Sequence, residues 1–156
     1  MNSELTLLRH TLATLAYRAT RAIEGAPESF ATFDGAGRRP DQILAHMGDL
    51  FDWALSMANG HASWHVSAPL PWRQEVERFF ATLSDFDDRI LSAEPFHAPV
   101  VRLLQGPIAD ALTHVGQLAM MRRLAACPMR GENYYVAAIE PGQTNAAQPA
   151  PVQPFR

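Results

Sequence analysis

Four stretches of the chain place apolar residues at alternating steps of three and four, the spacing of one face of an α-helix. The pattern covers residues 5–23, 40–60, 72–93 and 106–126, and glycine or proline bounds each stretch. No stretch shows the apolar–polar alternation of a half-buried strand. The pattern therefore predicts an all-α protein, an up-down four-helix bundle with short connections.

The C-terminal segment differs in character from the four stretches. The length of 156 residues fits one domain. We expect the bundle to occupy residues 1–130 and residues 131–156 to form an irregular tail, because the tail contains Pro141, Pro149, Pro151 and Pro154. Tyr134, Tyr135 and Phe155 are too apolar for a freely solvated tail, so we expect it to pack on the bundle or on a partner subunit.

Charge and cysteine content narrow the class of protein. The formal net charge is −3 and basic residues are scattered, so no patch for nucleic acid or an anionic membrane is predicted. Cys127 is the single cysteine, so no internal disulfide forms, and it is interpreted as a helix-end residue. The first residues lack the pattern of a signal peptide, and no run approaches the roughly 18 apolar residues of a membrane span. We expect a cytoplasmic protein.

The fourth stretch carries very little charge. Asp110 is the only charged side chain between Pro107 and Met121, so a largely buried helix is predicted. Gly116 at its centre lowers helix propensity, which suggests a close approach of another backbone. Asp110 and His114 are four residues apart and share a helix face, and Gln117 lies on that same face. A buried carboxylate needs a partner or a metal ion.

His46 supplies a candidate partner from the second stretch, where it falls within the inward apolar stripe. The residues support two interpretations equally: a divalent-metal site formed by His46, Asp110 and His114, or a buried hydrogen-bond network of the same side chains. Imidazole and carboxylate ligands suit Zn, Ni, Fe or Mn. In the metal interpretation, Gln117 and Thr113 orient the ligands or contact substrate.

The remaining histidines are weaker candidates. His61 and His65 are four residues apart, but they follow Gly60, so we interpret them as loop residues, with the rim of a substrate pocket as the alternative. His10 is expected on an outer face, and no role is assigned to His97. The third stretch is expected to present a solvated outer face formed by Arg73, Glu77, Arg78, Asp85 and Asp88.

Two segments carry a resemblance to a known family. A helix-two histidine in the segment 43–46 (Ile-Leu-Ala-His), together with a ligand position four residues before His-x-Gly-Gln in the segment 110–117, resembles the DinB-like superfamily of four-helix-bundle metalloproteins. The resemblance covers residues 1 to about 130 and implies His46, Asp110 and His114 as ligands. The family commonly has histidine where Asp110 stands, and the shorter, anionic aspartate favours a harder cation.

The resemblance also implies an activity. The members with an assigned reaction look like transferases that depend on a low-molecular-weight thiol. In those members the metal ion activates the thiol. We therefore expect one divalent ion, Zn or Ni before Fe or Mn, a small-molecule substrate with a thiol co-substrate, and a transferase or hydrolase activity. We also expect a homodimer. The alternatives are a non-catalytic module that binds a small ligand near Trp64 and Trp72, and a homodimer in which the tail supplies the interface.

Overall fold

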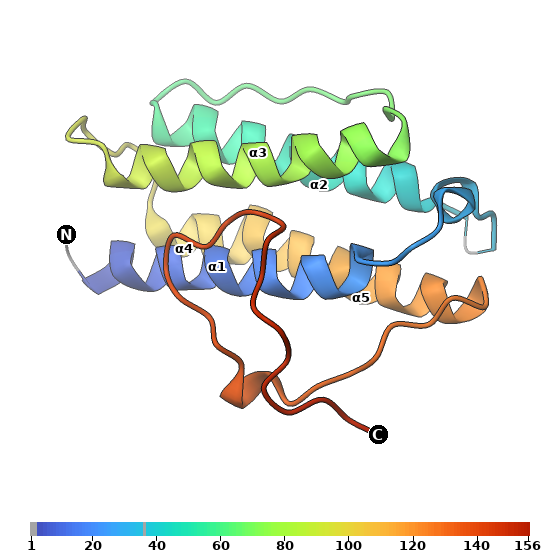
Figure 1. The fold of residues 1–156 in the computed structure, drawn as a ribbon. Coiled ribbons are helices and arrows are strands. Elements are labelled where there is room, and N and C mark those ends of the chain that lie inside the picture. Colours follow the sequence, from blue (N-terminus) through green and yellow to red (C-terminus); the bar gives the residue numbers. More distant parts are fainter. Residues whose placement is uncertain (1–2, 36) are drawn as a thin grey trace.

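The computed structural model describes residues 3–35 and 37–156, and within them it contains helices, turns and loops but no β-strand, only an isolated bridge between Glu132 and Pro154. The predicted all-α class is confirmed. Four long helices form the bundle: α1 (Ser3–Ile23), α2 (Pro40–Ala58), α3 (Trp72–Leu91) and α5 (Ala109–Leu124) (Figure 1). The short helical elements are η1 (Glu28–Thr32), α4 (Val100–Leu103), η2 (Leu104–Ile108) and η3 (Tyr134–Val136).

The order of helix directions corrects the up-down prediction, because α2 and α3 run parallel. Arg78 donates to the carbonyl of Ala45 near the start of both helices (3.1 Å), and Arg89 donates to the carbonyl of Ala58 near their ends (2.9 Å). The connecting residues 61–71 are extended and return along the outside of the bundle (Figure 1). An extended segment of this length spans about 36 Å, enough to pass the roughly 28 Å of α2.

The apolar stripes read from the sequence form one core. In α1 and α2 the stripe residues are mostly buried, and α3 contributes three fully buried aromatic or aliphatic side chains, Phe79, Leu83 and Phe86. Burial of a side chain of this size contributes about 1.5–3 kcal/mol. Leu91, an apolar residue at the end of α3, is an exception and is 53% exposed. Among the described residues, no helix combines the length and the apolar character needed to cross a membrane.

A short helical segment precedes the predicted fourth helix. Helical backbone starts at Val100 and continues through η2 into α5. The element η2 is a π-turn that contains Pro107. Proline has no N–H to donate, and a π-turn accommodates the missing bond without ending the helix. The π-turn ends just before Asp110, so it sets the rotation with which α5 faces α2.

The C-terminal tail lies across α1 (Figure 1). Glu132, 3% exposed, accepts hydrogen bonds from the Tyr17 hydroxyl (2.7 Å) and from Nε of Arg21 (3.0 Å). Farther along, the hydroxyls of Thr144 and Ser84 on α3 lie 3.0 Å apart. Burial against the tail raises the pKa of Tyr17, outweighing the opposing effect of Arg21. A buried carboxylate held by two donors anchors the tail to the bundle.

Candidate metal centre

Two helices bring His46, Asp110 and His114 together. Nε2 of His46 on α2 lies 3.3 Å from Oδ2 of Asp110 on α5, and Nε2 of His114 lies 3.5 Å from Oδ1 of the same carboxylate. The two imidazole rings stand edge to face, with centroids 5.0 Å apart. A ligand atom from each of the three side chains lies within 4.8 Å of the other two. The sequence-predicted set therefore converges at one point.

The spacing of these donor atoms fits a metal ion. Hydrogen bonds between an imidazolium and a carboxylate are usually about 2.7–2.9 Å long, shorter than either contact to Asp110. Ligand atoms about 2.0–2.1 Å from a tetrahedral ion are about 3.3–3.4 Å apart. The separations of 3.3 and 3.5 Å match this edge length. Each histidine faces a different oxygen of the same carboxylate.

Gln117 orients one of the two histidines. Nδ1 of His114 lies 2.7 Å from Oε1 of Gln117, one helical turn further along α5. When Nδ1 donates to this amide oxygen, the neutral ring has its unprotonated Nε2 facing Asp110. A lone pair and a carboxylate oxygen repel each other unless a proton or a cation lies between them. The Gln117 contact thus has the geometry of the hydrogen bonds that fix metal-binding histidines.

The burial of α5 is lower than the sequence predicted. The Asp110 side chain is 47% exposed, and Thr113 and Gln117 are also exposed, whereas His114 is 8% exposed. The predicted buried helix is wrong, because only one side of α5 packs on α1 and α2 and the opposite side, which carries Asp110, faces solvent. A Cβ on Gly116 would meet nothing within 4 Å, so the predicted close approach is wrong too. The metal interpretation therefore depends on donor geometry and not on burial of Asp110.

Two open clefts of about 520 Å³ each flank the three side chains. The first is lined by Gln42, His46, Asp49, Trp64, Val66 and neighbouring loop residues. The second is lined by Ile43, Thr113, His114, Gly116, Gln117, Met120 and Met121. Arg38 lines both clefts. The volumes are those of small-molecule sites, and a candidate ligand residue faces each cleft.

The two tryptophans expected near a bound ligand, Trp64 and Trp72, have different surroundings. Trp64 is 46% exposed on the extended segment, and its ring centroid lies 5.7 Å from that of His46. Trp72 is buried at the start of α3 and stacks edge to face on Phe30. Thr113 donates to the carbonyl of Ala109 on its own helix (2.7 Å) while lining the second cleft. Trp64 is thus the tryptophan placed to contact a ligand.

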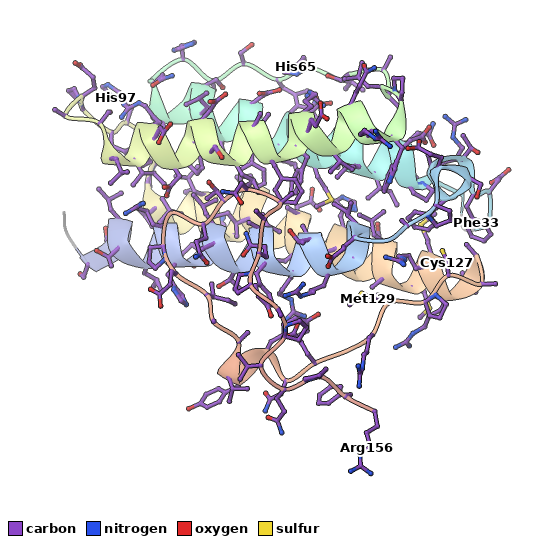
Figure 2. All side chains as sticks on the ribbon, in the orientation of Figure 1. Phe33, His65, His97, Cys127, Met129 and Arg156 are labelled. Atoms are coloured by element: carbon purple, nitrogen blue, oxygen red, sulfur yellow. The ribbon has the colours of Figure 1, made fainter. Side chains whose placement is uncertain are left out.

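A second histidine–carboxylate group, which was not predicted, lies next to the first along α2, and its Asp49 lines the same cleft as His46. Nε2 of His65 lies 3.2 Å from Oδ1 of Asp49 and 3.3 Å from Oδ2 of Asp52. His65 belongs to the extended segment, as Figure 2 shows, so its interpretation as a loop residue is confirmed. The spacing of Asp49 and Asp52, three apart in α2, was the available signal. We call Asp49, Asp52, His65 and Arg78 the Arg78 cluster.

Arg78 already supplies a cation to these carboxylates. Its guanidinium donates to Asp52 (2.9 Å) and Glu75 (2.9 Å), and it contacts Asp49 as well. The prediction that Arg78 is a solvated surface charge is therefore wrong. Burial alone would raise the pKa of Asp49, but two hydrogen bonds from Ser67 and the charge of Arg78 lower it. This cluster fastens the extended segment to α2 and α3.

The other candidates remain outside both groups. His61 is exposed with Nδ1 3.4 Å from a backbone carbonyl, His10 is exposed on α1 as expected, and His97 packs against Gly60. Cys127 follows α5 as a half-buried free thiol, in line with its interpretation as a helix-end residue.

Comparisons with family models, curated proteins and solved structures return no match to this chain. The function must therefore be argued from the site. Two groups of three metal-capable side chains are found in residues 3–35 and 37–156: the His46–Asp110–His114 site, and Asp49, Asp52 and His65 of the Arg78 cluster. Because the Arg78 guanidinium already donates to the carboxylates of the second group, the first is the candidate metal centre.

Proposed function

We propose that the protein binds one divalent metal ion through His46, Asp110 and His114 and acts as a metal-dependent enzyme. The observation that carries the proposal is the placement of two imidazole nitrogens 3.3 and 3.5 Å from the two oxygens of one carboxylate. Three protein ligands leave a coordination position for water or substrate, as in catalytic zinc sites. Zn or Ni suits this nitrogen–oxygen set best, and Fe or Mn is also compatible.

The proposed reaction is transfer of a low-molecular-weight thiol to an electrophilic small molecule, as the DinB-like resemblance implies. A metal ion in this site supplies a lowered thiol pKa, because a coordinated thiol is deprotonated. The chain itself contributes the open clefts in which the two reactants meet. His46 lines one cleft and His114 lines the other, so both reactants reach the same centre. The new carbon–sulfur bond replaces the bond to the leaving group, and the thiol proton passes to solvent.

Metal retention tests the proposal directly. The protein is purified without chelator, challenged separately with Zn, Ni, Fe and Mn, dialysed and analysed for metal content. We expect one equivalent of ion per chain. His114→Ala should abolish retention while the far-ultraviolet circular dichroism remains helical. His65→Ala removes the histidine of the Arg78 cluster and is the matched control, which should keep the full equivalent.

Two results would overturn the proposal. One is the absence of stoichiometric binding for all four ions. The other is equal loss of metal from His65→Ala and His114→Ala, which would place the ion elsewhere or show nonspecific binding.

A further inference from the structure

Arg38 is the cationic side chain that lines both clefts beside the candidate metal centre. It lies in the loop before α2 and is exposed. In the sequence, a loop arginine next to Arg39 has no distinguishing pattern. In the fold, Arg38 lines one cleft together with His46 and the other cleft together with His114.

Arg38 also differs from the arginines around it. Arg39 pairs with Asp41 through two hydrogen bonds (3.0 and 2.9 Å). Arg122 is buried and donates to backbone carbonyls, and Arg78 is held by its three carboxylates. Arg38 makes no hydrogen bond or ion pair with any described part of the chain. Its guanidinium is therefore available to a ligand.

The charge of the site favours an anion. A divalent ion next to the single carboxylate of Asp110 leaves a net charge of about +1, and Arg38 adds a further positive charge at the cleft wall. Asp49 lines the first cleft, whereas the second cleft is lined by Arg38 and His114 and, among the described residues, by no carboxylate. A guanidinium presents two parallel donors that match one carboxylate.

We infer that Arg38 binds a carboxylate group of the small molecule that occupies these clefts. This inference rests on the proposed function, since it identifies the substrate class of the same site. The thiol or its acceptor then has two attachment points, a donor atom at the ion and a carboxylate at Arg38. One free arginine balances one negative charge, so a monocarboxylate is favoured over a phosphate.

The test compares thiols that differ only in charge. The protein is loaded with Co²⁺ as a spectroscopic substitute, and thiol binding is followed by the thiolate-to-cobalt charge-transfer absorbance. The probes are mercaptoacetate, 3-mercaptopropionate and 4-mercaptobutyrate, each paired with its neutral amide. In the wild type, at least one acid should bind about tenfold more tightly than its amide. Arg38→Gln should remove this preference without changing amide binding or metal content.

Arg102→Gln is the matched control. Arg102 is exposed on α4 and lines neither cleft, so its substitution makes the same change in net charge and should keep the preference. The inference is overturned if no acid binds better than its amide, or if the preference survives in Arg38→Gln, as it would if the carboxylate itself bound the ion.

Failure of the metal site is recognised separately. Metal content is measured on the same samples, and loss of stoichiometric metal contradicts the proposed function. The Arg38 inference is then judged without metal, from the side-chain Nε–Hε resonance of Arg38 in ¹⁵N nuclear magnetic resonance spectra. Titration with the acids should shift this resonance, and titration with the amides should not. The absence of a shift with every acid would overturn the Arg38 inference.

Discussion

The His46–Asp110–His114 site and the Arg78 cluster use similar side chains on the same helix for different ends. Both combine histidine and aspartate with ligand atoms within 4.8 Å of one another, and both include residues of α2. In the Arg78 cluster a guanidinium lies among the carboxylates, and Ser67 donates two further hydrogen bonds. The first site contains no such cation. The two sites have similar donors. The guanidinium among the carboxylates is what distinguishes the anchoring ion-pair network from the candidate metal centre.

Removal of Arg78 is expected to have the largest effect on stability. Arg78→Met leaves Asp49 and Glu75, which are 2% and 0% exposed, without their cation. Removing one partner of a buried ion pair costs about 3–5 kcal/mol. Because Arg78 is partly exposed, we expect the free energy of unfolding, measured in urea, to fall by about 3 kcal/mol. Arg73→Met, an exposed arginine on the same helix, should change the free energy of unfolding by less than about 0.5 kcal/mol. Equal, small effects of both substitutions would show that the cluster does not stabilise the fold.

A crossed pair of substitutions separates the two sites further. Gln117→Ala removes the partner of His114 Nδ1 and should weaken metal binding about 10–100-fold, with little change in the unfolding of the metal-free protein. Ser67→Ala removes a hydroxyl donor to Asp49 and should lower stability by about 1 kcal/mol while metal affinity is unchanged. Competitive metal titration and urea unfolding measure the two quantities. If Ser67→Ala weakened metal binding as much as Gln117→Ala, the two sites would not be independent.

The sequence predicted the parts of the molecule that depend on local periodicity. The helices over residues 5–23 and 40–60 and their buried stripes followed from steps of three and four. The convergence of His46 with residues 110 and 114 followed from placing polar side chains near the middle of two such stripes. The stripes depend only on spacing along one helix, which the sequence contains directly, and the convergence required only that the two stripes face the same core.

The features that depend on partners in space were not predicted. The parallel arrangement of α2 and α3 requires residues 61–71 to run extended along the bundle, and the breakers in that segment indicate only a loop. Arg78 resembles any surface arginine until its carboxylates on α2 are placed beside it. The scarcity of charge around Asp110 was taken as burial, whereas an uncharged helix face can also form the wall of an open cleft.

Acid unfolding should depend on Asp49. Because the folded pKa of Asp49 is below that of an unfolded aspartate, the stability it contributes is complete above about pH 4 and is lost as the pH falls through the folded pKa. We therefore expect Asp49→Asn to be less stable than the wild type at pH 7, with the difference narrowing below about pH 4. Asp85→Asn changes an exposed aspartate of α3 and should show no such narrowing. A constant difference between Asp49→Asn and wild type at all pH values would contradict the ion-pair role.

Two glycines, one beside each site, provide the smallest and most local comparison. A Cβ on Gly48 in α2 would lie 2.8 Å from Nη1 of Arg78, which cannot move away without losing its carboxylates. A Cβ on Gly116 in α5 would meet nothing within 4 Å. Gly48→Ala should therefore lower the free energy of unfolding by about 1–2 kcal/mol through overpacking, despite its gain in helix propensity. Gly116→Ala should raise it by about 0.5–1 kcal/mol.

Urea unfolding of the two variants measures both effects, and metal titration adds a second readout. Because Gly116 is exposed and lines the second cleft beside His114, the added methyl group narrows the cleft without contacting a ligand atom. Metal affinity should stay within about twofold of the wild type in both variants, since neither methyl group approaches the three ligands. A stabilising Gly48→Ala would mean that the Arg78 guanidinium moves freely, and the Arg78 cluster would then be a loose surface network rather than the anchor of the extended segment.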